Sequence, residues 1–241
     1  MIPLKDDIPT RRFPIVTLVL IAVNVLVYFL FEQGLWELGD VGNERVNEYG
    51  AIPYEITNPG EDVPGPADQA PFWLTILTSM FLHGSLLHLA GNMLFLWIFG
   101  NNIEDSMGRP TFVVFYLLGG AAALGLQVAI DPDSIVPTIG ASGAIAAVLG
   151  AYARLYPRAR VVTVIIIIIF FTVVTLPALL VLGLWFLLQL LPAFSEPVGS
   201  TGGGVAYFAH IGGFLFGALV IKLFASHVHE DYDQPHRIPV Y

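Results

Sequence analysis

Cysteine is absent from this 241-residue chain, which excludes disulfide bonds, thiolate catalysis and cysteine-ligated zinc. Charged residues are also scarce. They make up 12% of the sequence, about half of the fraction that is usual in soluble domains. The few charges sum to −9 and form no basic stripe, so nucleic-acid binding is not indicated. These absences point away from a soluble protein and toward the apolar residues that fill the chain.

Hydrophobic residues account for 56% of the sequence, and they gather in runs long enough to cross a bilayer. A spanning helix needs roughly 20 mostly apolar residues, because about 30 Å of hydrocarbon is crossed at about 1.5 Å per residue. Six runs qualify, at about residues 13–31, 82–100, 110–130, 137–156, within 161–191, and 203–224. The sequence therefore predicts an all-α, polytopic membrane protein built as a bundle of six transmembrane helices.

The remaining segments give the expected domain organisation. We divide the chain into a cytoplasmic N-terminal segment (1–12), a membrane domain (13–224) and a cytoplasmic C-terminal tail (225–241). Residues 32–72, rich in Pro, Gly and Asp, are expected to form a long external loop with a short helix near 41–49. The first run could be a signal peptide, but it is long for one and has no clear cleavage site, so we interpret it as a retained helix.

The fifth run is too long for one straight span, because its 31 residues would form about 46 Å of helix. Its first part, residues 161–171, is β-branched and aromatic, and we expect a loop or an interfacial stretch there. The span itself is expected nearer to residues 172–191, with a possible kink at Pro177.

Basic residues set the expected orientation, because cytoplasmic loops of membrane proteins carry an excess of Lys and Arg. With six spans both termini lie on one side, and only Arg45 falls on the opposite side. The terminal side carries Lys5, Arg11, Arg12, Arg109, Arg158, Arg160 and Arg237, with Arg154 and Lys222 at helix ends. This side is therefore expected to be the cytoplasm, as in a prokaryotic plasma membrane.

Few polar residues lie inside the predicted spans, and they fall at similar depths. His88 and Asn92 are near the start of the second run, Ser142 near the start of the fourth and His210 near the start of the sixth. Each alone could serve helix packing or an interhelical hydrogen bond. Because all three runs start on the external side, however, the four side chains are expected at one level. Ionisable residues at such depth indicate a functional site.

The chemistry of this set fits acyl transfer. A serine hydroxyl becomes nucleophilic when a base such as His210 removes its proton. His88 and Asn92, spaced i and i+4, share one helix face, and with the Ser142 backbone N–H they can stabilise an oxyanion. No carboxylate lies within these three runs near their external ends. A Ser–His dyad is therefore favoured over a triad.

Small residues favour close contact between the fourth and sixth helices. Ser142, Ala146 and Gly150 recur at four-residue spacing, and Gly213 and Gly217 do the same in the sixth run. Such faces let helix backbones approach closely, which is expected to bring His210 toward Ser142.

Three motifs in order resemble those of the rhomboid family over nearly the whole chain. They are His83-Gly84 with His88 and Asn92, then Gly140-Ala141-Ser142-Gly143, and finally Ala209-His210 with Gly213 and Gly217. The resemblance implies an intramembrane serine protease with Ser142 as nucleophile and His210 as base. It also implies an oxyanion hole of His88, Asn92 and the Ser142 amide, with His83, Gly140 and Gly143 in support.

The resemblance further implies transmembrane protein substrates that enter from the bilayer, past the fifth run, and a reaction without metal or cofactor. Two positions depart from the family. Leu74-Thr75 stands where many relatives have Trp-Arg, and Ala146 stands where some have an aromatic residue beside the histidine.

Two other functions remain as alternatives. A non-catalytic rhomboid-like protein would bind membrane clients, but such proteins usually lack the serine or the histidine. A transporter would use buried polar groups, but these do not line a path to the cytoplasmic side. An intramembrane metalloprotease is excluded, because no Glu lies between His83 and His88.

Overall fold

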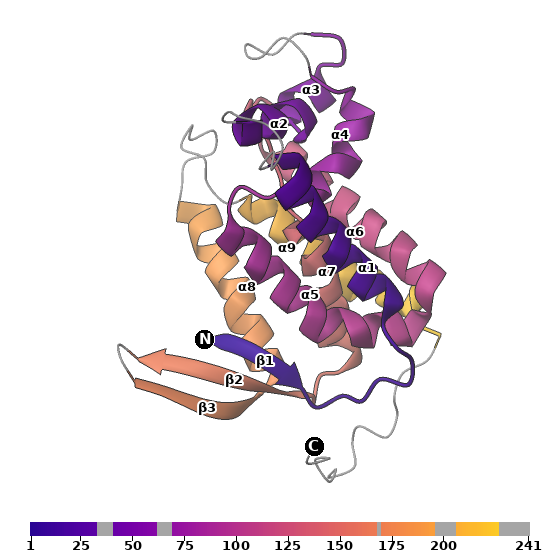
Figure 1. Ribbon diagram of the computed structural model, residues 1–241, viewed down its shortest axis with the longest axis vertical. Helices are drawn as coiled ribbons and strands as arrows, with labels where there is room; N and C mark the ends of the chain where they lie inside the picture. Colours follow the sequence, from indigo (N-terminus) through magenta and orange to yellow (C-terminus); the bar gives the residue numbers. More distant parts are fainter. Residues whose placement is uncertain (33–40, 62–68, 168–169, 196–205, 227–241) are drawn as a thin grey trace.

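The computed structural model describes residues 1–32, 41–61, 69–167, 170–195 and 206–226 (Figure 1). These residues form a mostly helical bundle with one small sheet. In chain order the elements are β1 (Ile2–Asp6), α1 (Ile15–Leu26), the π-helix η1 (Val27–Glu32), α2 (Val41–Tyr49), α3 (Pro53–Thr57), α4 (Phe72–Thr78), the 3₁₀-helix η2 (Ser79–Phe81), α5 (Leu86–Met107), α6 (Arg109–Ile130), α7 (Ser142–Leu155), β2 (Arg160–Ile167), β3 (Phe170–Pro177), α8 (Ala178–Ser195) and α9 (Tyr207–Phe224). The predicted C-terminal tail lies outside the described residues after Ser226.

Four helical segments in the described part of the chain are long and apolar enough to cross a membrane: Ile15–Glu32, Leu86–Met107, Arg109–Ile130 and Tyr207–Phe224. Two more of the expected spans correspond to α7 and to the described apolar part of α8, Ala178–Leu191, which are shorter. The chain is therefore a multi-helix membrane protein, and the count of six spans stays a prediction.

Helix α7 lies in the interior of the bundle (Figure 1), with every residue from Gly143 to Tyr152 buried. Its neighbour α9 touches it backbone to backbone. A Cβ added at Gly217 would overlap the Ala147 carbonyl oxygen, one at Gly213 would overlap that of Gly143, and one at Gly150 that of Phe214. Only residues without side chains permit this contact, which fixes how far α9 can slide along α7.

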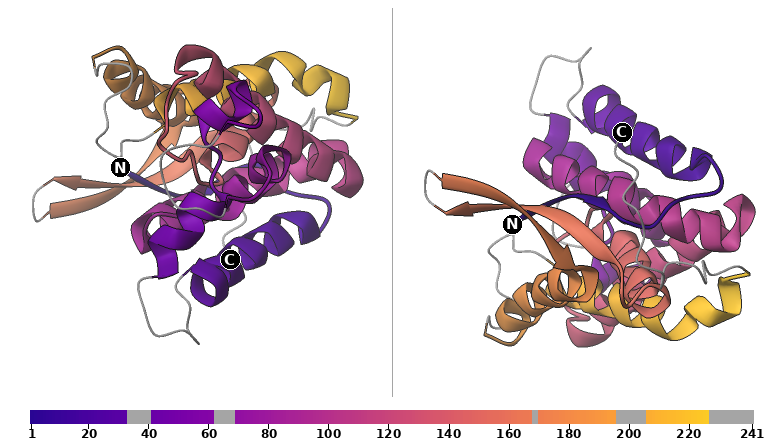
Figure 2. Two further views of the ribbon diagram at one scale, coloured as in Figure 1. Left: turned by 90° about the horizontal axis from the view of Figure 1, so that it is seen from above. Right: turned by 90° about the horizontal axis from the view of Figure 1, so that it is seen from below.

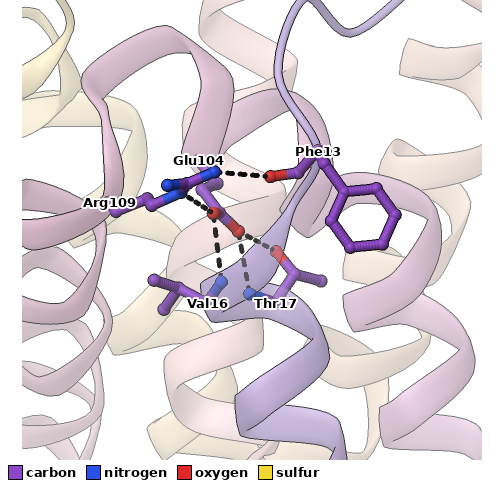
Figure 3. A network of polar contacts seen from close by, with 5 residues as sticks. All are labelled: Phe13, Val16, Thr17, Glu104 and Arg109. Atoms are coloured by element: carbon purple, nitrogen blue, oxygen red, sulfur yellow. Dashed lines mark hydrogen bonds and ion pairs between the residues drawn. The ribbon is translucent and has the colours of Figure 1, made fainter.

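The start of α1 is held by a buried carboxylate at the far end of α5, as Figure 3 shows. Glu104 is 3% exposed, and it accepts hydrogen bonds from the Thr17 backbone N–H and hydroxyl, both at 2.8 Å, and from the Val16 N–H at 3.1 Å. Arg109 Nε lies 3.9 Å from the same carboxylate. Since the first N–H groups of a helix have no partner within it, Glu104 caps α1 and ties it to the α5–α6 junction.

That junction is shorter than expected. A link was predicted at about residues 101–109, but α5 continues to Met107 and α6 begins at Arg109, so Gly108 alone separates them. Gly108 has φ +82°, a conformation that only glycine adopts without cost. The polar residues near Asn101 stay helical because they find partners inside the protein. Asn102, for example, donates a hydrogen bond to Asp6.

The segment predicted as one long external loop is partly helical. Helix α2 occupies the expected position, α3 adds a further helical turn, and α4 begins at Phe72, where the predicted loop ends. Ala51 and Thr138 form an antiparallel bridge, with N–H to O distances of 3.2 and 2.8 Å. This bridge attaches the outer segment to the connection that leads into α7.

The structure corrects the interpretation of the start of the fifth run. Residues 161–171, expected to form a loop or an interfacial stretch, belong to β2 and the start of β3, and residues 172–177, expected to begin the span, complete β3. The two strands pair from Arg160↔Pro177 to Ile167↔Phe170, and β1 adds to β2 in the order β1-β2-β3. Pro177 ends β3 instead of kinking a helix, and α8 begins after it at Ala178. The β-branched composition that argued against a helix is the reason, because such residues favour strands.

Asp6 joins this sheet to the bundle. Its carboxyl is 7% exposed and accepts hydrogen bonds from the Tyr152 hydroxyl at 2.6 Å and from the Asn102 amide. Burial disfavours the charged form and raises the pKa of Asp6 to about 7, although the Tyr152 bond opposes this.

Candidate active site

Ser142 is the first residue of α7, and the chain turns sharply just before it. Gly140 has φ +115°, which favours glycine over any residue with a side chain. The Gly140 N–H donates to the Ser79 carbonyl at 2.8 Å, so the turn is attached to η2. Ser142 itself is half-buried, and its N–H is among those that a helix start leaves without an intrahelical partner.

His210 lies on the first turn of α9 and reaches Ser142 directly. Its Nε2 is 2.6 Å from the Ser142 Oγ, and the side chain is 7% exposed. The glycine contacts between α7 and α9 set this distance, because they bring the two helix starts together. The sequence predicted a similar membrane depth for these two residues, and in the structure they are within hydrogen-bonding distance.

Two residues of α8 complete the surroundings of His210, and neither was found from the sequence. Gln189 Oε1 lies 2.8 Å from His210 Nδ1, and the Trp185 ring is 5.8 Å from the imidazole centre to centre. The aromatic residue that Ala146 does not supply is thus supplied by α8. The signal that could have revealed Gln189 is its polarity, because it is a lone amide in the apolar run 178–191.

His88 and Asn92 lie on the first turns of α5, where the Ser85 hydroxyl caps the helix by accepting the His88 N–H at 3.2 Å. A Cβ added at Gly140 would lie 2.7 Å from the His88 ring, so this ring packs on the turn that precedes Ser142. The Asn92 Nδ2 is buried without a hydrogen-bond partner among the described residues. A buried amide donor is costly to leave unpaired, which fits a position prepared for an acceptor.

The His83 side chain packs against the His88 ring. It is 1% exposed, and its ring meets that of His88 edge to face, with centres 5.1 Å apart. Its backbone N–H donates to Glu32 Oε2 at 3.0 Å. Glu32, assigned to the external loop from the sequence, is in fact 1% exposed at the end of η1. This carboxylate lies beside His83 and not beside His210.

The predicted small residues lie between helices. A Cβ added at Gly143 would meet the Ala123 Cβ of α6 at 2.7 Å, and Ala146 packs 3.2 Å from where a Cβ of Gly213 would stand. Within the described residues, no group of three or more His, Cys, Asp or Glu side chains is placed to hold a metal ion.

Comparison with known proteins identifies the family of the chain. Residues 71–227 match the family described as "Rhomboid domain", and this region holds all the site residues above except Glu32. The chain belongs to the rhomboid family. The matched part of this rhomboid chain runs from α4 to the end of α9, so it does not include the first helix, although the resemblance was expected over nearly the whole chain.

Several curated proteins are similar to this rhomboid chain. "Rhomboid protease GluP" of Bacillus subtilis is 32% identical over 138 residues, which is 57% of this chain and 24% of that protein. "Presenilin-associated rhomboid-like protein, mitochondrial" of Homo sapiens is 29% identical over 155 residues, 64% of this chain and 36% of that protein. "Rhomboid protein 1, mitochondrial" of Saccharomyces cerevisiae is 30% identical over 157 residues, 61% and 40% respectively. The chain thus spans well under half the length of these relatives.

Proposed function

We propose that this rhomboid chain is an intramembrane serine endopeptidase that cleaves transmembrane segments of other membrane proteins. The observation that carries the proposal is the 2.6 Å contact between Ser142 Oγ and His210 Nε2, within a bundle of membrane-spanning helices. A nucleophile within hydrogen-bonding reach of its base is the arrangement that acyl transfer requires. The relative named as a rhomboid protease supports the same reaction class.

The proposed reaction has two steps. Ser142 Oγ attacks the carbonyl carbon of the scissile peptide bond while His210 Nε2 takes the hydroxyl proton, and His210 then gives that proton to the leaving amine. An acyl-enzyme on Ser142 remains. Water, deprotonated by the same Nε2, attacks the ester, which releases the acid product and returns the proton to Ser142.

Gln189 positions the base. For Nε2 to accept the Ser142 proton, the neutral imidazole must carry its own proton on Nδ1. The Gln189 Oε1 at 2.8 Å is a carbonyl oxygen suited to accept that Nδ1–H. Gln189 thereby selects the competent tautomer and holds the ring plane, without the negative charge that an aspartate would supply.

The oxyanion that forms at the attacked carbonyl needs fixed donors. We assign this role to the Ser142 backbone N–H, the His88 side chain and the unpaired Asn92 Nδ2. The His88 ring packs on the Gly140 turn that precedes Ser142, and Asn92 follows one turn later on the same face of α5. The start of α7 adds its own favourable field for a negative charge.

We place both termini in the cytoplasm, because the basic residues gather at their end of the bundle. With this orientation, Ser142 at the start of α7 lies toward the external side of the membrane. We propose a prokaryotic plasma membrane as the location, whereas two of the relatives above are named as mitochondrial. Activity is expected to fall as pH decreases, since a protonated His210 cannot accept the serine proton.

Co-reconstitution tests the proposal. The chain and a tagged single-span substrate are placed in liposomes, and cleavage is compared with that by Ser142→Ala and His210→Ala. Cleavage by the wild type alone supports the proposal. Labelling with a fluorophosphonate provides a substrate-independent readout: we expect it to be lost in Ser142→Ala and retained in Ser226→Ala. Cleavage by both wild type and Ser142→Ala, or equal labelling of both variants, would overturn it.

A further inference from the structure

The outer half of the β2–β3 hairpin projects away from the bundle. β1 pairs with β2 only from Asp6↔Val161 to Ile2↔Val164, and farther out β2 and β3 pair with each other from Ile165↔Thr172 to Ile167↔Phe170. Figures 1 and 2 both show this part extending sideways beyond α8, across the long axis of the molecule. We name residues 165–167 and 170–172 the hairpin tip.

The hairpin tip is apolar and exposed on both of its faces. Phe170 and Phe171 are 75% and 76% exposed, and Ile166 and Ile167 are 54% and 62% exposed. Because successive strand residues point to opposite faces, each face carries one exposed phenylalanine and one exposed isoleucine. A sheet with one face in water normally alternates apolar and polar residues, and the tip lacks that alternation.

The base of the hairpin lies level with the end of α7 and the start of α8. Tyr152, in the last turn of α7, donates to Asp6 of the sheet at 2.6 Å, and the Ala178 N–H that starts α8 donates to the Ala159 carbonyl at 2.7 Å. Two exposed arginines lie at the same end of the bundle: Arg154 in the last turn of α7 and Arg160 at the start of β2. Basic residues at helix ends are typical of the boundary between hydrocarbon and headgroups.

The apolar surface of the tip continues into that of α8. No charged residue occurs from position 161 to position 191, and β3 passes directly into α8 at Ala178. The outward side of α8 carries exposed leucines throughout, namely Leu179, Leu180, Leu184, Leu187, Leu188 and Leu191. A helix with such a face in a membrane protein is covered by lipid, and the tip prolongs that lipid-facing surface sideways.

We infer that the hairpin tip is seated in the bilayer, at the boundary between headgroups and acyl chains at the basic end of the bundle. Its depth, its direction across the long axis and its two apolar faces fit this lipid surface. Phe170 and Phe171 act as the anchors, while Arg154 and Arg160 meet the phosphates. Contact of the tip with lipid would hold the start of α8, the helix that carries Trp185 and Gln189. The inference does not depend on the proposed protease activity.

Site-directed spin labelling tests the inference, and the absence of cysteine from the chain means that no background thiol must first be removed. Nitroxides are attached to Phe171→Cys and Ile166→Cys in protein reconstituted in vesicles of phosphatidylcholine with phosphatidylglycerol. Collision with O₂, which concentrates in lipid, is compared with collision with a water-soluble nickel chelate. Leu188→Cys provides the lipid-facing reference, and Ser226→Cys provides the aqueous reference at the same end.

We expect the ratio of O₂ to nickel collision at both tip positions to lie closer to the Leu188→Cys value than to the Ser226→Cys value. Adding Phe170→Glu to Ile166→Cys should shift the ratio toward the aqueous reference. Tip ratios equal to that of Ser226→Cys would overturn the inference. Low collision with both agents, or spin–spin broadening that disappears on dilution with unlabelled protein, would also overturn it in favour of a protein partner or a second copy.

Discussion

Replacing Gln189 by leucine removes the acceptor for the His210 Nδ1–H while keeping a side chain of similar size. A neutral hydrogen bond contributes about 0.5–1.5 kcal/mol net, and about 1.36 kcal/mol corresponds to a tenfold change in rate. We therefore expect Gln189→Leu to lower kcat roughly two- to tenfold through this bond alone. Loss of the competent tautomer adds to the decrease, because nothing then keeps the proton on Nδ1.

The assay is cleavage of a reconstituted single-span substrate, with kcat and KM measured across pH. The pH profile of Gln189→Glu distinguishes a positioning role of Gln189 from a purely structural one, because a structural role would leave the acid limb of the profile unchanged. An anionic acceptor favours the imidazolium, so the acid limb of the profile should shift to higher pH. Leu188→Ala, on the lipid-facing side of the same helix, is the matched control and should retain wild-type rates. A kcat within twofold of wild type in Gln189→Leu, together with an unmoved acid limb in Gln189→Glu, would refute the reasoning.

Asn92→Ala removes an oxyanion donor, so kcat should fall by about 10²–10³ with little change in KM; an unchanged kcat would contradict the assignment. Gly217→Ala places a methyl group against the Ala147 carbonyl, and we expect a loss of about 1–3 kcal/mol of stability, measured by unfolding in SDS and absent in Leu219→Ala. The third prediction concerns pH. Burial raises the pKa of Asp6 from 3.8 to about 7, so the fold binds this proton more tightly than the unfolded chain does. Its contribution is therefore complete below about pH 4 and is lost as pH rises to about 7, which amounts to the order of 4 kcal/mol. Asp6→Asn should flatten the dependence of unfolding on pH over that range, and an equally steep dependence in the variant would exclude Asp6 as its source.

Much of the site could be predicted because its residues are rare where they occur. His88, Ser142 and His210 stand out in apolar helices, and their distance from the membrane surface follows from counting residues along each run. The glycines of α9 indicated a close helix contact, and the contact with α7 is what brings the two reactive side chains together.

What the sequence did not reveal depends on contacts between segments far apart in the chain. Gln189 and Trp185 come to His210 only because α8 packs beside α9, and no periodicity within α8 encodes that choice of neighbour. Glu32 looked solvent-exposed because it is acidic and precedes a polar segment, yet it is buried against the His83 backbone.

The strands were missed for a different reason. A run of β-branched residues next to a span fits a loop, an interfacial segment or a strand equally well until a pairing partner is known. β2 pairs with β3, its neighbour in sequence, and also with β1 near the N-terminus, which Asp6 fixes to the bundle.

The short central helix has a consequence for the membrane as a permeability barrier. Its 14 residues measure about 21 Å, against about 30 Å of hydrocarbon, so this helix is too short to reach both membrane surfaces. Beneath, the helix is enclosed and the rings of Phe99, Tyr152 and Tyr156 pack at 4.9 and 5.1 Å. If the chain cleaves membrane proteins as proposed, these packed rings would keep the two aqueous sides of the membrane separate while water reaches Ser142 from one of them.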